Sequence, residues 1–261
     1  MDVFTAPGKG STMEPFLQEK KEPPKTALIT GASRGIGRAC AEAFAEAGYS
    51  LLLTCSKSME ELVALTKKLS AQYGGCYRPF RADMGNIEEV AQVFSGLSTL
   101  DVLINNAGIS YVGLLSEMSP ADWRRLMAVN LDSCFYACKY AIPLMLKKHS
   151  GKIINVSSVW GSVGASMEVA YSASKGAVNA FTRALAKELA PSNIQVNAVA
   201  CGVIDTSMNA CFSKEELEAL KREIPADRLG TPQEAAALIL QTAQAPSYMT
   251  GQIITIDGGW Y

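Results

Sequence analysis

The stretch that decides the fold is TALITGASRGIG, residues 26–37. A short apolar run leads into three glycines spaced GxxxGxG, and a helix candidate follows. Gly31 permits a tight turn, Gly35 lets the backbone approach a phosphate, and Gly37 lets the helix pack close to the strand. The start of such a helix offers free N–H groups and the positive end of its dipole. The stretch therefore predicts a strand, a phosphate-binding turn and a helix.

Short apolar runs alternate with amphipathic segments along the rest of the chain. The strand candidates are residues 26–30, 50–54, 101–105, 152–156, 194–200 and 252–256, with 76–80 as a weaker seventh. The helix candidates lie near residues 35–47, 59–73, 87–96, 119–149, 171–189, 213–223 and 232–243. Strands that are apolar on both faces and separated by helices require crossover connections, which give a parallel sheet covered on both sides. The sequence predicts an α/β fold of the Rossmann type, a doubly wound parallel sheet of about seven strands with helices on both faces, in a single domain over residues 25–261.

Composition excludes several classes of function. The net charge of −1 and the pI near 6.0 provide no basic field for a nucleic-acid backbone or an anionic membrane surface. No apolar stretch reaches the roughly 18 residues of a membrane-spanning helix. Residues 1–24 are rich in Gly, Pro, Glu and Lys and lack the apolar region of a signal peptide, so we expect a disordered N-terminal tail.

The 7 cysteines and the single histidine limit the chemistry. An odd cysteine count without a CxxC pair is typical of reduced thiols in the cytoplasm and does not predict a metal site. His149 lies in KKHSGK, which indicates an exposed helix end and argues against most Ser-His and Cys-His hydrolase schemes. Acid–base chemistry must therefore use another side chain.

The loop after the second strand candidate indicates which dinucleotide to expect. An acidic residue there would pair with the ribose 2′-hydroxyl of NAD, but residues 54–57 read Thr-Cys-Ser-Lys and no carboxylate occurs before Glu60. A 2′-phosphate would instead be bound by Ser56, Lys57 and the guanidinium of Arg34. NADP(H) is the expected cofactor, although Lys57 taken alone could be a solvated loop cation.

Two further strand ends suit the nucleoside. Asp83 can accept a hydrogen bond from the adenine amino group, and Ala107 and Gly108 leave room for a flat ring. Taken singly, each segment is better explained as a plain turn. The cofactor-binding residues expected at these strand ends are Gly31, Ser33, Arg34, Gly35, Ile36, Gly37, Cys55, Ser56, Lys57, Asp83, Met84, Asn106, Ala107 and Gly108.

The candidate reaction centre lies in SSVWGSVGASMEVAYSASK, residues 157–175. A Tyr-x-x-x-Lys pair alone is close to what chance supplies, but Tyr171 and Lys175 follow a strand candidate on the side of the sheet where the cofactor is expected. Hydride delivery to a carbonyl needs a proton donor, and tyrosine can serve if its pKa of about 10 falls toward neutrality. An ammonium about 5 Å away on the same helix face would stabilise the phenolate by at most about 3 kcal/mol.

Two further polar residues complete this expected centre. Ser158 can donate to the substrate oxygen while Tyr171 protonates it. Asn130, in AVNLDS, could hold a water that connects Lys175 to solvent. The competing interpretation of Asn130 is a helix residue bonded to backbone.

Residues 25–261 resemble the short-chain dehydrogenase/reductase family in the order and spacing of TGASRGIG, NNAG, Asn130, Ser158, the Tyr-x-x-x-Lys pair and TGQIITIDGG. The resemblance implies a catalytic tetrad of Asn130, Ser158, Tyr171 and Lys175. It also implies a homotetramer, and cofactor contacts from Tyr171, Lys175, Gly202, Ile204 and Thr206. The family commonly has Pro-Gly where this chain has Cys201-Gly202. We expect Cys201 to be a small packed residue beside the nicotinamide, with a redox-sensitive thiol as the alternative.

Two resemblances compete over the substrate. RLGTPQEAA (228–236) and SYMTGQIITIDGG (247–259) resemble bacterial 3-oxoacyl-[acyl-carrier-protein] reductases of fatty-acid biosynthesis, which implies reduction of a 3-oxoacyl to a 3-hydroxyacyl thioester. SSVWGSVGASMEVAYSASK and ALAKELAPSNIQVN resemble a subgroup that reduces 5-aminopentanone-modified elongation factor P. Another small ketone or hydroxysteroid stays open, as does a non-catalytic NADP-binding sensor or scaffold. The segment 206–226 is expected to form a lid, whose Lys214, Lys221 and Arg222 either are solvated or meet an acidic carrier protein.

Overall fold

Apolar runs form seven strands of one parallel sheet in the computed structural model, which describes residues 24–261. The strands are β1 (Thr26–Ile29), β2 (Ser50–Cys55), β3 (Tyr77–Arg81), β4 (Val102–Asn105), β5 (Gly151–Ser158), β6 (Ile194–Cys201) and β7 (Ile253–Ile256). Their order is β3-β2-β1-β4-β5-β6-β7, so chain order reverses between β1 and β4. The predicted doubly wound sheet is confirmed, including its weakest strand candidate. Residues 1–23 of the expected tail lie outside the described part of the chain.

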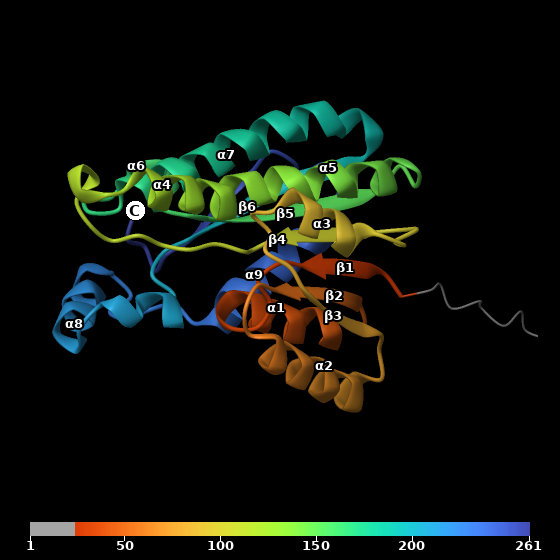
Figure 1. Ribbon diagram of the computed structural model, residues 1–261, viewed down its shortest axis with the longest axis horizontal. Coiled ribbons are helices and arrows are strands. Elements are labelled where there is room, and N and C mark those ends of the chain that lie inside the picture. Colours follow the sequence, from red (N-terminus) through yellow and green to blue (C-terminus); the bar gives the residue numbers. More distant parts are fainter. Residues whose placement is uncertain (1–23) are drawn as a thin grey trace, which may run out of the picture.

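Helices cover both faces of this sheet (Figure 1). One face carries α1 (Gly35–Glu46), α2 (Met59–Tyr73) and α9 (Pro232–Gln244). The other carries α3 (Ile87–Phe94), α5 (Ser133–Leu146) and α7 (Val169–Leu189). Beyond the carboxyl ends of the strands lie α4 (Pro120–Met127), α6 (Trp160–Val163) and α8 (Lys214–Glu223). Among residues 24–261, no helix combines the length and the apolar character needed to cross a membrane.

The helix predicted over residues 119–149 is interrupted, and that prediction is wrong in this respect. α4 ends at Met127, a π-helical turn, η2, covers Ala128–Asp132, and α5 begins directly after it. A π turn widens the helix while its apolar periodicity continues almost unchanged, so the sequence pattern does not reveal it. Buried Asn130 lies in the middle of this turn. Such turns occur often at functional sites.

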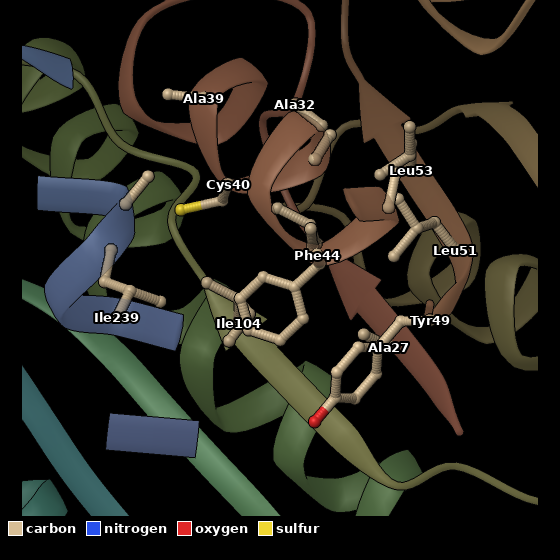
Figure 2. Close-up of a cluster of buried hydrophobic side chains, with 14 of the residues drawn as sticks. Ala27, Ala32, Ala39, Cys40, Phe44, Tyr49, Leu51, Leu53, Ile104 and Ile239 are labelled. Carbon is tan, nitrogen blue, oxygen red and sulfur yellow. The ribbon is translucent and has the colours of Figure 1, made fainter. Parts of the chain in front are cut away.

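The core beneath α1 holds the first strand and its helix together (Figure 2). Phe44 is fully buried and meets the ring of Tyr49 edge-on, with the ring centroids 5.0 Å apart. Leu51 and Leu53 of β2 and Ile239 of α9 pack in the same cluster. The resulting burial of aromatic and branched side chains fixes the start of α1 beside the carboxyl end of β1.

A buried chain of hydrogen bonds links β4, β5 and α7. The side-chain amide of Asn105 donates to the Asn155 oxygen at 2.8 Å, and the Asn155 amide donates to the Thr182 hydroxyl at 2.8 Å. Thr182 in turn donates to the Val178 carbonyl at 2.8 Å. Because these groups are shielded from water, each bond offsets the cost of burying a polar side chain.

We expect Asn155→Leu to lower the free energy of unfolding by about 1–3 kcal/mol, because it leaves the buried Asn105 amide with only the weak sulfur acceptor of Cys138. Urea denaturation followed by circular dichroism measures the loss. The double variant Asn105→Leu/Asn155→Leu should cost less than the sum of the two single changes, since it removes both partners. Strict additivity would contradict the coupling of the two residues.

Candidate active site

The turn between β1 and α1 is open to an anion. Gly31 and Gly35 adopt φ values of +66° and +55°, which side-chain-bearing residues rarely adopt. In the described chain, α1 has no side-chain N-cap and no acidic residue in its first turn, whereas Asn86 caps α3 and Ser119 caps α4. The first amides of α1 are thus left for a negatively charged ligand.

Gly37 keeps this turn compact from behind. A Cβ at Gly37 would lie 2.3 Å from the Gly31 carbonyl oxygen and 2.5 Å from the Asn106 side-chain nitrogen. That nitrogen donates to the carbonyls of Thr30 at 2.8 Å and Gly31 at 3.1 Å. The Thr30 hydroxyl accepts from the backbone amides of Asn106 at 3.0 Å and Ala107 at 2.9 Å. The ends of β1 and β4 are therefore tied together, and Gly37 supports the turn without lining the groove.

A groove of about 420 Å³ runs over these strand ends. Of the expected cofactor residues, it is lined by Gly31, Ser33, Arg34, Gly35, Ile36, Cys55, Ser56, Lys57, Asp83, Met84, Asn106, Ala107, Gly108 and Thr206. The glycine turn, the uncapped start of α1 and the cations Arg34 and Lys57 fit a dinucleotide that carries a 2′-phosphate.

Asp83 already has partners at the far wall of this groove. Its carboxylate accepts from Arg125 at 2.6 Å and from the Gly85 amide at 3.0 Å. Burial alone would raise the pKa of Asp83, but these two donors hold it below its usual value. The expected contact with adenine stays a prediction. Arg125 lies in α4 and carried no signal in the sequence that would place it here.

A second cavity of about 150 Å³ adjoins the groove and shares Ile36, Asn106, Gly108 and Thr206 with it. Ser158 at the end of β5 and Tyr171 and Lys175 in the first turns of α7 line this cavity. Gly202 and Ile204, which follow β6, lie in the same wall. The structure therefore brings three of the four residues of the expected tetrad to one cavity wall, next to the groove.

Burial opposes the acidity expected of Tyr171. It raises the pKa of the phenol above its ordinary value, Glu168 and Cys201 add to this, and the hydrogen bond with Ser158 lowers it. Lys175 is not among the groups that shift this pKa, and the expectation that it brings the pKa of Tyr171 toward neutrality stays a prediction. The Lys175 ammonium lies 5.7 Å from the ring centroid and donates to the Val156 carbonyl at 2.8 Å. Burial also lowers the pKa of Lys175.

Asn130 braces the loop after β4. Its oxygen accepts from the Ile109 amide at 2.8 Å, and its nitrogen donates to the Ile109 carbonyl at 2.9 Å and to the Ser174 hydroxyl at 3.0 Å. Ser174 donates to the Tyr171 carbonyl at 2.7 Å, so Asn130 also holds the start of α7. A role for Asn130 in a water relay stays a prediction.

The side chains of the cavity lining that sequence reasoning missed include Trp160, Glu168 and Trp260. Trp160 and Glu168 lie within the segment 157–175, but their spacing did not indicate where they point. Trp260 comes from the C-terminal end, which lies beside α6 (Figure 1). Cys201 is buried, and burial raises its pKa to about 12, which favours the packed residue over the redox-sensitive thiol.

A phosphate-binding turn that opens onto a cavity lined by serine, tyrosine and lysine is typical of an enzyme that transfers hydride with a dinucleotide. Residues 25–217 match the family model of the short chain dehydrogenases, and the chain belongs to that family.

Relatives match almost the whole chain. The chain is 40% identical over 239 residues to the uncharacterized oxidoreductase YmfI of Bacillus subtilis strain 168, and the alignment covers 91% of this chain and 99% of the relative. It is 38% identical over 242 residues to the 3-oxoacyl-[acyl-carrier-protein] reductase FabG of Aquifex aeolicus strain VF5, and this alignment covers 91% of this chain and 97% of the relative. The crystal structure of YwfH, an NADPH-dependent reductase involved in bacilysin biosynthesis, aligns with a TM-score of 0.86 at 27% identity, over 92% of this chain and 99% of that one.

We expect Lys57→Glu to weaken NADPH binding at least about tenfold while changing NADH binding much less, because only NADPH brings a 2′-phosphate to this end of the groove. Fluorescence titration with each dinucleotide measures both affinities. Lys67→Glu makes the same charge change at an exposed position of α2 and should leave the ratio unaltered. If Lys57→Glu weakens both dinucleotides equally, Lys57 does not contact the 2′-phosphate.

Proposed function

We propose that this protein reduces a ketone to a secondary alcohol with NADPH. The observation that carries the proposal is the meeting of Ser158, Tyr171 and Lys175 in one cavity wall, directly beside a groove suited to a 2′-phosphorylated dinucleotide. Family membership and the NADPH-dependent reductase among the structural neighbours support it. A non-catalytic sensor or scaffold would need the glycine turn but not this wall.

Ser158, Tyr171 and Lys175 each have a separate role in the proposed reduction. NADPH, when bound, supplies a hydride to the carbonyl carbon, and the π electrons of the C=O bond move to its oxygen. Ser158 donates a hydrogen bond to that oxygen, and the Tyr171 hydroxyl transfers its proton to it. The Lys175 ammonium then stabilises the resulting phenolate until solvent returns the proton. Burial raises the pKa of Tyr171, so its hydroxyl is protonated at neutral pH. It gives up the proton because the alkoxide that hydride transfer produces is a stronger base than the phenolate.

Two substrates are candidates. A 3-oxoacyl thioester is supported by relatives such as the Aquifex aeolicus reductase. The 5-aminopentanone group of modified elongation factor P is supported by one observation, the carboxylate of Glu168 in the cavity wall, which suits a substrate that carries an amine. The homotetramer, the cytoplasmic location and the contact of the lid with a carrier protein stay predictions.

Tyr171→Phe tests the proposal. We expect it to lower kcat at least about a hundredfold, because the only change is the loss of the proton donor. NADPH oxidation is followed at constant cofactor with acetoacetyl thioesters and, side by side, with 5-aminopentanone-modified elongation factor P. NADPH affinity, measured by fluorescence, should stay near that of the unchanged protein.

Tyr140→Phe is the matched control, because Tyr140 lies in α5 and stacks on Phe94, away from the cavity. It should leave turnover unchanged. Full turnover by Tyr171→Phe would overturn the assigned role of the tyrosine. The absence of NADPH oxidation with every ketone tested would overturn the reductase function itself.

A further inference from the structure

Among residues 24–261, Glu168 and Lys175 are the only charged residues that line the substrate cavity. Lys175 is engaged by the Val156 carbonyl. Within residues 24–261, no ion pair includes Glu168. Within the part of the chain that the structure describes, the cavity therefore contains one carboxylate that forms no ion pair.

The side chain of Glu168 does not cap the helix that it precedes. It occupies the N-cap position of α7, where carboxylates often accept from the first free amides. Among the described residues, its side chain makes no such capping bond. Burial raises the pKa of its carboxyl, and the neighbouring Trp160 side chain lowers it. The carboxylate therefore lies beside Trp160 in the cavity lining, near enough to Tyr171 for its charge to raise the pKa of the phenol.

Aromatic rings surround the same part of the wall. The ring centroids of Trp160 and Trp260 lie 5.0 Å apart at an interplanar angle of 62°, and both residues line the cavity. Tyr261 packs behind them, 5.4 Å from Trp160 and 4.9 Å from Trp260. Two indoles beside a carboxylate form the environment that binds alkylammonium groups, because the ring faces attract a cation while excluding water.

We propose that Glu168, Trp160 and Trp260 form a subsite for an ammonium group on the substrate, so that the physiological ketone is an amino ketone. This rests on the proposed reduction at Tyr171. Glu168 occupies the N-cap position of α7, three residues before Tyr171, and both residues line the same cavity, so an ammonium at Glu168 lies near the carbonyl that accepts the hydride. A ketone with a neutral chain would leave the carboxylate unpaired in a half-buried wall.

A pair of ketones of equal shape tests the subsite. 5-(Dimethylamino)pentan-2-one is a cation at neutral pH and cannot cyclise to a stable imine, and 6-methylheptan-2-one replaces its ammonium nitrogen with carbon. We expect kcat/KM with NADPH to favour the amino ketone at least about tenfold. Glu168→Gln keeps the size of the side chain but should bring the ratio of the two kcat/KM values to about one. Glu188→Gln, at an exposed position near the end of α7, should leave the ratio unchanged.

Binding is measured in parallel by tryptophan fluorescence, which does not require turnover. The amino ketone should bind more tightly than its isostere, and Glu168→Gln should abolish the difference. Reduction of both ketones with no preference in either assay, or a preference that survives Glu168→Gln, would overturn the subsite. Preferential binding without NADPH oxidation would support the subsite and overturn the reductase function.

Discussion

The hydrogen bonds from the Asn106 side chain to the carbonyls of Thr30 and Gly31 hold the two strand ends between which both cavities open. These bonds require that α1 has no side chain at Gly37, because a Cβ there would clash with the Asn106 side-chain nitrogen and with the Gly31 carbonyl. With the turn closed in this way, the start of α1 faces the groove. Asn106 and Gly108 then form the shared wall between cofactor groove and substrate cavity. The Asn106 amide thus helps to fix the position of the groove relative to the second cavity.

Most of the fold could be predicted from the sequence because its determinants are local. Each buried strand is a continuous apolar run. The glycines of TGASRGIG stand where a side chain would strain the backbone or clash with neighbouring atoms. The π turn around Asn130 could not be predicted in this way, since a single extra residue in a helical turn barely alters the apolar periodicity. The pair of Asp83 and Arg125 depends on tertiary packing of α4 against the end of β3, which no spacing in the chain reports.

Three of the four residues expected in the reaction centre line one cavity, but their electrostatic environment could not be predicted from the sequence. Tyr171 and Lys175 stand on one helix face, as their spacing indicates, yet the ammonium is held by the Val156 carbonyl and burial dominates the pKa of the phenol. The spacing of two residues along a helix does not show which other groups bind to their charged atoms. Glu168 shows the same limit, since its effect on the phenol depends on the direction that its side chain takes into the wall.

Trp260, near the end of the sequence, lines the second cavity. Asp257 accepts hydrogen bonds from the amides of Gly259 and Tyr261, both at 3.0 Å, and so fixes the last turn of the chain against Trp160. Because Trp260 lines the cavity and packs on Trp160, the loss of residues 260 and 261 would remove part of the cavity lining. The conformation of residues 257–261 therefore bears directly on the shape of the cavity.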